Sequence, residues 1–345
     1  MNARERLLAT LEFKGPDRCP IAHYLFPGAF RRHGQKLLDL LDRYPDDSGN
    51  KSTEVNRQKA LEEGETGPEV IEWQDSWGIV WRRMRGYTCG EVLHPAIPDW
   101  DDHPHFTVPP VNSAERYAPS AKAIEADHGE RYVVGIVPVS LFAQVHHIRG
   151  LNNVLADFHL NPDRLAGLVD TMVELSLESI DVYHRIGANA VMFYDDWGLQ
   201  DRLMISPRLW RDFYKPRYTL VWGHAHACGM TNWMHSCGKI DDVLDDMIEA
   251  GLDVIQMDQQ MNMGLEQLGA RFGGRLTFWC PVDIQAVMPR NDAAEIEQYV
   301  QRMIRALGGR GGGFIGKFYP SPFAAGHDEA MVKVMCEAFL RYGSY

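Results

Sequence analysis

The sequence lacks the features that mark membrane and secreted proteins. It contains no run of about 18 apolar residues, the length that a membrane-spanning helix needs. Its start, MNARERLLATLEF, has no apolar core of the kind found in a secretion signal. We therefore expect a cytoplasmic protein with no membrane partner. The six cysteines in 345 residues are scattered, which indicates core residues or ligands rather than a disulfide framework.

An excess of basic residues is also missing. Lysine and arginine number 35 against 47 aspartates and glutamates, and the net charge is -12. This balance argues against binding to a phosphate backbone, so no nucleic-acid partner is expected. The hydrophobic fraction of 45% and the charged fraction of 24% are those of an ordinary globular protein.

The sequence does contain an alternation of apolar, β-type runs with helical segments. The runs lie at 20–26, 72–81, 132–139, 188–197, 231–237, 252–258, 276–280 and 312–318. The helical segments between the later runs end on glycine, and two of them open with Asn-Pro or Ser-Pro. We predict one α/β domain over residues 1–345, a (β/α)₈ TIM barrel whose N-terminal third is irregular and contains a hairpin. A doubly wound open sheet is the alternative.

Barrels of this kind place their chemistry where strands end and loops begin. Polar side chains do gather at the ends of the later runs: Asp195, Asp196, His235, Cys237, Gln256, Asp258, Cys280 and Lys317. Some polar residues must stand where strands reach solvent, but thiols and an imidazole are unusual choices for that role. The pattern therefore predicts a functional site at the carboxyl end of the barrel.

His235 and Cys237 are the strongest candidates within this group. Side chains alternate along a strand, so these two residues face the same side and can share one metal ion. Imidazole nitrogen and thiolate sulfur are typical zinc ligands, and a catalytic zinc has three protein ligands. Cys280 is the predicted third ligand, since inward residues of alternate barrel strands share a layer. The competing interpretation is that the three residues belong to the core.

A second motif, His224-x-His226-x-Cys228, also has the spacing of metal ligands. It lies at the end of a helical segment, where residues two apart face different directions. A structural role is therefore favoured for these three residues.

Several segments resemble the uroporphyrinogen decarboxylase-like superfamily over nearly the whole chain. They are ARERLLATLEFKGPDRCPI, FYDDWGLQDRLMISPRLWRDFYKPRY, MHSCGKIDDVLDDMIEAGLDVIQ, LTFWCPVDIQAVMP and GGGFIGKF. The resemblance implies a (β/α)₈ barrel. Its members divide into true porphyrinogen decarboxylases and zinc-dependent methyltransferases that work with a corrinoid protein, and the His-x-Cys-Gly of this chain resembles the methyltransferase branch.

Two departures from the superfamily patterns narrow these expectations. True decarboxylases have an arginine-rich loop, whereas residues 23–34 read HYLFPGAFRRHG and keep only Arg31 and Arg32 of such a cluster. An octacarboxylate substrate needs convergent cations, so porphyrinogen decarboxylation is disfavoured. Methyltransferases that use coenzyme M have a cysteine after the last strand, where this sequence reads GKFYPSPFAAG. That departure leaves Cys280 as the third ligand, or an oxygen ligand such as Asp196 or Asp258.

The resemblance implies that a methyl group moves between a small substrate and the cobalt of a corrinoid (cobalamin) carried by a partner protein. The substrate expected is a methoxylated aromatic or another methyl donor. Zn²⁺ would stabilise the leaving group, and a nearby acid would protonate it. Related barrels often form homodimers. The alternatives are a decarboxylase or other lyase acting on a small carboxylic acid, and a non-catalytic barrel that only binds a ligand.

Candidate residues can be named for the acid and for the contacts with the substrate. Asp195, Asp196 and Asp75 are the candidate acids, and because two adjacent aspartates cannot both point inward, at least one of the first two is structural. Residues expected to contact the substrate lie at or near strand ends: Tyr194, Trp197, Gln256, Asp258 and Lys317.

Overall fold

The computed structural model describes residues 1–25, 29, 33–48, 69–85, 90–322 and 325–344. Its α-helices are α1 (Ala3–Leu11), α3 (Gln35–Arg43), α5 (Ala114–Asp127), α6 (Ala143–Arg149), α7 (Leu151–Leu160), α8 (Pro162–Arg185), α9 (Pro207–Leu209), α10 (Lys215–Ala227), α11 (Leu244–Ala250), α12 (Leu265–Phe272), α13 (Ala293–Leu307) and α14 (Glu329–Tyr342). Short 3₁₀ turns span Trp100–His105, Gln260–Asn262 and Met288–Arg290, and a π-helical turn spans Trp210–Tyr214. No helix among these is both long and apolar enough to cross a bilayer.

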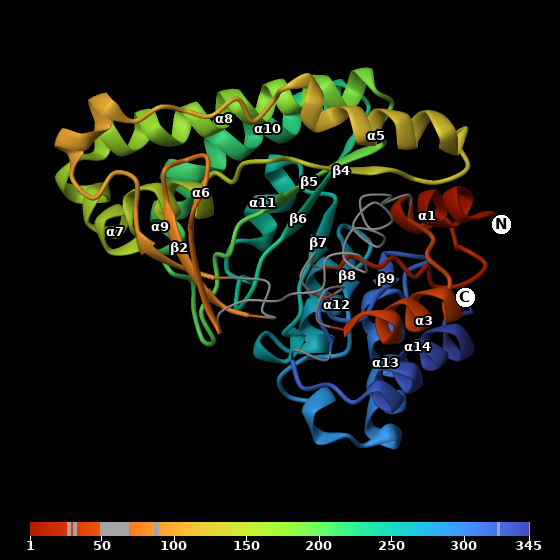
Figure 1. Ribbon diagram of the computed structural model, residues 1–345. Helices are drawn as coiled ribbons and strands as arrows, with labels where there is room; N and C mark the ends of the chain where they lie inside the picture. The colour runs from red at the N-terminus through yellow and green to blue at the C-terminus, as the bar shows by residue number, and fades with distance from the viewer. Residues whose placement is uncertain (26–28, 30–32, 49–68, 86–89, 323–324, 345) are drawn as a thin grey trace.

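The strands belong to two separate sheets. They are β1 (Val70–Gln74), β2 (Val80–Met84), β3 (Glu91–His94), β4 (Val134–Ile136), β5 (Ala190–Tyr194), β6 (Thr231–His235), β7 (Val254–Gln256), β8 (Thr277–Cys280) and β9 (Phe314–Gly316). The first three form an antiparallel sheet. The other six form a parallel sheet in chain order, which Figure 1 shows as a fan of strands between layers of helices.

Two short N-terminal segments close the parallel sheet into a barrel. Ile21 forms a parallel bridge with Gly316 of β9, and Ser48 forms one with Tyr132, just before β4. The backbone N–H of Asp47 donates to the carbonyl oxygen of Ile21 at 2.7 Å, which joins the two segments. The barrel thus has eight strand positions, and the predicted (β/α)₈ fold is confirmed over the open-sheet alternative.

One side chain holds this seam together. The carboxylate of Asp47 is 3% exposed and accepts hydrogen bonds from Arg6 at 2.8 Å, Arg18 at 2.8 Å and the backbone N–H of Ile21 at 2.9 Å. Arg6 belongs to α1, and Arg18 lies three residues before Ile21 in the sequence. Arg6 and Arg18 therefore have a structural role, because their bonds to Asp47 stabilise the closed barrel.

The run at 72–81, one of the eight strand candidates, is not a barrel strand but lies in the hairpin expected in the N-terminal third. It folds back on itself as the hairpin of β1 and β2, and residues 47–48 occupy the barrel position instead. The carboxylate of Asp75 explains the reversal, because it accepts the backbone N–H groups of Trp77 and Ile79 at 2.9 and 3.0 Å. The hairpin lies beside α6 (Figure 1), where the ring centroids of Trp81 and His147 are 4.9 Å apart.

Alternation along the strands divides the core into two clusters. The cluster inside the barrel contains Leu7, Ala22, Tyr132, Val134, Ala190, Met192, Trp233, Val254, Trp279 and Ile315. The larger cluster contains the opposite strand faces and the helices packed on them. Strand register then aligns Tyr194, His235, Gln256 and Trp279 as one row, two residues beyond Met192 and Trp233. This row faces the barrel interior at its carboxyl end.

Candidate metal centre

The loops that follow β5 and β6 lie in close contact, and two glycines make this possible. A Cβ atom on Gly238 would lie 2.3 Å from the carbonyl carbon of Gly198, and the φ angle of Gly238 is +75°. The N–H of Gly198 donates to the carbonyl of Cys237 at 3.1 Å, and the N–H of Trp197 donates to the Ser236 hydroxyl at 3.0 Å. The Asp-Trp-Gly and His-Ser-Cys-Gly sequences therefore fix the two loops against each other.

This contact brings Asp196, His235 and Cys237 together. The Nε2 atom of His235 lies 3.3 Å from the Cys237 sulfur and 3.4 Å from Oδ1 of Asp196. The same Asp196 oxygen accepts the backbone N–H of Cys237 at 2.8 Å. The three potential ligand atoms all lie within 4.8 Å of one another. Nitrogen, sulfur and oxygen donors in this arrangement fit a zinc ion with three protein ligands.

Residues behind His235 fix the orientation of its ring. Nδ1 forms a hydrogen bond with the side-chain oxygen of Gln256, which can only accept, so Nδ1 carries the proton. The amide nitrogen of Gln256 donates to Oδ1 of Asp258 at 2.7 Å. The lone pair of Nε2 is then free to point at the other two ligand atoms. Supporting bonds of this kind are characteristic of metal-binding histidines.

The charges of the three groups depend on one another. Burial disfavours ionisation of Asp196, but its hydrogen bond and attraction to His235 outweigh this effect and lower its pKa to about 2. Burial acts to lower the pKa of His235, yet Asp196 and Cys237 raise it well above its ordinary value. Burial raises the pKa of the Cys237 thiol. A divalent cation would take the place of the protons shared by these groups.

Cys280 does not join this group, contrary to our expectation for the third ligand. Strand register places Trp279, not Cys280, in the inward row with Gln256. Cys280 therefore points to the opposite face of β8 and is fully buried in the cluster under the helices. Burial raises the pKa of its thiol to about 12. Asp196, which the sequence left open as an oxygen ligand, lies beside His235 and Cys237 instead.

Two of the three candidate acids have structural roles. The carboxylate of Asp195 is buried and accepts the backbone N–H groups of Leu141, Phe142 and Ala143 at 2.6 to 3.0 Å, together with the hydroxyl of Tyr218. It caps the start of α6 rather than facing the barrel interior. Asp75 is likewise occupied within its hairpin, where its second oxygen accepts the indole N–H of Trp81 at 2.7 Å.

The residues expected to contact a substrate also include both a core residue and residues that lie near the candidate metal centre. Trp197 is fully buried under the helices and stacks on Phe142 with ring centroids 4.5 Å apart, so it belongs to the core. Tyr194 lies in the inward row, with its ring centroid 5.8 Å from that of His235. Gln256 and Asp258 belong to the hydrogen-bonded chain behind His235.

Lys317 directly follows β9 and lies entirely out of solvent. Its ammonium nitrogen is 3.8 Å from Oδ1 of Asp258 and 5.0 Å from the ring centroid of Trp279, and it has no hydrogen-bond partner among the residues that the structure describes. Burial lowers its pKa. The pair formed with Asp258 extends the chain of interactions from His235 across the barrel interior.

Two histidines near Asp196 were not predicted from the sequence. His146 and His147 lie on α6, and both experience the charge of Asp196. Burial lowers the pKa of His146 to about 4 and that of His147 to about 3, so both rings are neutral at neutral pH. The tandem histidines of SLFAQVHHIRG, directly after a predicted strand, were the available signal. The segment with Arg31 and Arg32, and Cys89, lie outside the described residues.

Comparison with known proteins agrees with this architecture. The family model described as uroporphyrinogen decarboxylase (URO-D) matches residues 93–338, and the chain belongs to this family. A solved methyltransferase from Methanosarcina mazei is similar in fold, with a TM-score of 0.68, 15% identity and 99% of each chain covered. No curated protein matches the sequence.

Other solved barrels are much less similar. A D-psicose 3-epimerase has a TM-score of 0.39 at 11% identity, over 65% of this chain and 82% of its own. A xylose isomerase-like TIM barrel protein from Mycobacterium smegmatis has a TM-score of 0.34 at 13% identity, over 66% of this chain and 92% of its own. Neither value is high enough to align the two sites.

Proposed function

We propose that the chain is a zinc-dependent methyltransferase that moves a methyl group between a small substrate and the cobalt of a corrinoid protein. The observation that carries this proposal is the group of Asp196, His235 and Cys237 at the carboxyl end of the barrel. Membership of the URO-D family and the fold shared with a solved methyltransferase support it. A methoxylated aromatic compound is the substrate class that we favour.

The three side chains have complementary tasks in this proposal. His235 offers the lone pair of Nε2, since Nδ1 is held by Gln256. Cys237 offers a thiolate once a cation lowers its pKa, and Asp196 offers one carboxylate oxygen that the N–H of Cys237 already orients. When bound, zinc would supply a Lewis acid for the oxygen that leaves with the methyl group removed.

The proposed reaction balances with cobalt as the nucleophile. The bond between the methyl carbon and the substrate oxygen breaks, and a bond between that carbon and cobalt forms. Cobalt(I) supplies the electron pair and becomes cobalt(III), and the leaving oxygen takes up a proton. His146 and His147 are the neighbouring groups able to relay that proton from water, since Asp195 is saturated with hydrogen bonds.

Elemental analysis of purified variants tests the metal centre. We expect zinc in the wild type and loss of one equivalent in Cys237→Ser and in Asp196→Asn, because each change removes one donor. Cys280→Ser is the matched control, a thiol removed from the opposite face of β8, and it should keep this zinc. Loss of the metal in Cys280→Ser but not in Asp196→Asn would contradict the proposed ligand set.

An activity assay then tests the reaction. The wild type, loaded with zinc, is mixed with 2-methoxyphenol and cob(I)alamin, and methylcobalamin formation is followed by absorbance. We expect methyl transfer that disappears in Cys237→Ser. Retained zinc with no methyl transfer from any of a panel of methoxylated aromatics would favour a non-catalytic barrel. Release of CO₂ from a small carboxylic acid would favour a lyase instead.

A further inference from the structure

A second group of potential metal ligands lies at the other end of β6. Asp181 of α8 and His224 and Cys228 at the end of α10 have ligand atoms within 4.8 Å of one another. Nε2 of His224 lies 2.8 Å from Oδ1 of Asp181. Cys228 precedes β6 by three residues, whereas His235 is the last residue of that strand. The two groups therefore lie at opposite ends of the strand.

Helical geometry determines which residues of His224-x-His226-x-Cys228 can bind the same metal ion. The N–H of Cys228 still donates to the carbonyl of His224 at 3.1 Å, so the last helical turn includes both residues. Residues four apart share a helix face, whereas His226 faces elsewhere and pairs with Asp253 at 2.7 Å. The two residues of this motif that can share a metal ion are therefore His224 and Cys228, which are four apart, and not neighbours that are two apart.

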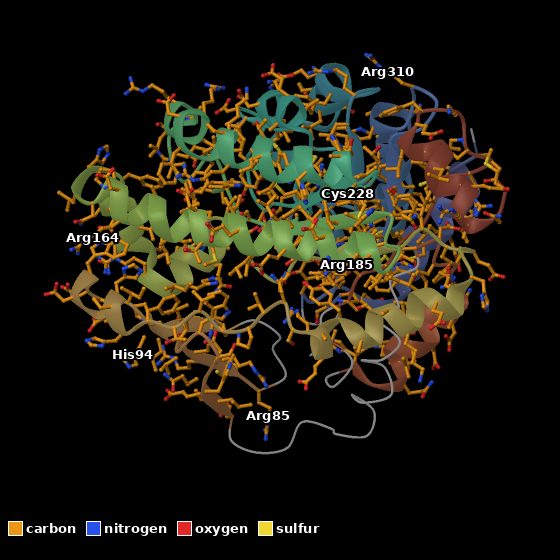
Figure 2. The ribbon with its side chains drawn as sticks, turned by 90° about the horizontal axis from the view of Figure 1, so that it is seen from above. Arg85, His94, Arg164, Arg185, Cys228 and Arg310 are labelled. Carbon is orange, nitrogen blue, oxygen red and sulfur yellow. The ribbon has the colours of Figure 1, made fainter. Side chains whose placement is uncertain are left out.

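A cation can reach this group from the solvent. The side chain of His224 is 36% exposed and that of Asp181 is 50% exposed, and among the described residues Asp181 makes no ion pair with lysine or arginine. Figure 2 shows Cys228 beside the C-terminal half of α8, near Arg185. An imidazole, a thiol and a carboxylate that converge from two helices are the donor types that zinc prefers, with a fourth position left for water.

We propose that Asp181, His224 and Cys228 form a second zinc site, separate from the centre at the carboxyl end of the barrel. A bound ion would link α8 to α10 and stabilise the side of the barrel where β6 begins. This proposal does not depend on the methyltransferase function, because none of its residues contacts the first centre. It requires only that the folded chain binds one more zinc than the first centre accounts for.

Zinc titration with a colorimetric chelator as competitor counts the sites. We expect two equivalents in the wild type and one in His224→Ala and in Cys228→Ser. His226→Ala is the matched control, since it removes an imidazole of the same helix that pairs with Asp253 and leaves the three proposed ligands intact. It should still bind two. The same count in the wild type, His224→Ala and Cys228→Ser would overturn the proposal, as would equal loss in His226→Ala and His224→Ala.

A second measurement separates the two centres. In the Cys237→Ser background, cobalt(II) should still produce a thiolate-to-cobalt charge-transfer band, and Cys228→Ser should abolish it. Zinc should also raise the melting temperature of Cys237→Ser but not that of the double variant. No thiolate band in Cys237→Ser would overturn the site, provided that its circular dichroism spectrum shows a folded protein.

Discussion

Replacement of Gly238 by alanine tests whether the close contact of the two loops builds the metal centre. The new Cβ would lie 2.3 Å from the carbonyl carbon and oxygen of Gly198 and 2.6 Å from the carbonyl oxygen of Leu199, all of them backbone atoms. Ordinary contact begins at 3.4 Å. One loop must therefore move by about 1 Å, which exceeds the tolerance of about 0.2 Å on metal-ligand distances.

Two costs add up in this variant. A side chain at φ +75° costs about 1 to 2 kcal/mol, and overpacking costs about 1 to 3 kcal/mol more. We expect the free energy of unfolding to fall by about 2 to 5 kcal/mol. Because Cys237 precedes the altered residue, zinc affinity at the first centre should fall at least about tenfold, as happens when ligands lose their support.

Urea unfolding and zinc competition measure the two effects. Gly129→Ala is the matched control, since Gly129 has a φ of +77° but no atom within 4 Å of the added Cβ. The free energy of unfolding of Gly129→Ala should fall only by the cost of a side chain at positive φ, about 1 to 2 kcal/mol, and its zinc affinity should not change. Equal destabilisation of the two variants, with unchanged zinc affinity in Gly238→Ala, would refute the reasoning.

Three further changes test the supports of the fold and the site. Asp195→Asn should lower the free energy of unfolding by about 2 to 3 kcal/mol in urea, because three backbone N–H groups lose a charged acceptor, while zinc content stays the same. Gln256→Leu should weaken zinc binding about 10- to 100-fold in a competition assay, because Nδ1 of His235 loses its acceptor. Asp157→Asn should cost about 3 to 5 kcal/mol, since it leaves the buried Arg149, 2.8 Å away, without its counter-ion. Burial opposes ionisation of Asp157, but its bonds to Arg149 and to neighbouring donors lower its pKa below 3.8, so its contribution is complete above that pH and is lost as the pH falls further. Acid titration of Asp157→Asn should lack this part of the pH dependence, and an unchanged acid profile would contradict the assignment.

The barrel could be predicted because its later strands are apolar on both faces and helices with recognisable ends lie between them. The six runs from 132–139 onward each contain one strand of the parallel sheet. The first two positions are different, because the predicted run 20–26 does contain Ile21 but no predicted run contains Ser48. Each consists of a single bridge, at Ile21 and at Ser48, and one bridge leaves no periodic pattern in the sequence. The run 72–81 has strand composition, but its turn around Asp75 sends it back into a hairpin.

The site was predictable where residues lie on one strand and less so where strands must be aligned. The shared face of His235 and Cys237 follows from local alternation, and the structure places them 3.3 Å apart. Cys280 required the correct phase of β8 relative to β7, which depends on register and is not visible in the sequence. The contribution of Asp196 depends on two loops that meet at glycines, a contact between segments about 40 residues apart.

The seam of the barrel has a consequence for how the chain folds during synthesis. Ile21 pairs with Gly316, so the first strand position emerges from the ribosome long before its partner exists. The strands from β5 to β9 each pair with the strand made just before, and they can assemble on β4 in the order of translation. The N-terminal segment must wait through nearly the whole of synthesis. Closure of the cylinder is thus the last event, and substitution of Asp47 should slow that final step while the open sheet still forms.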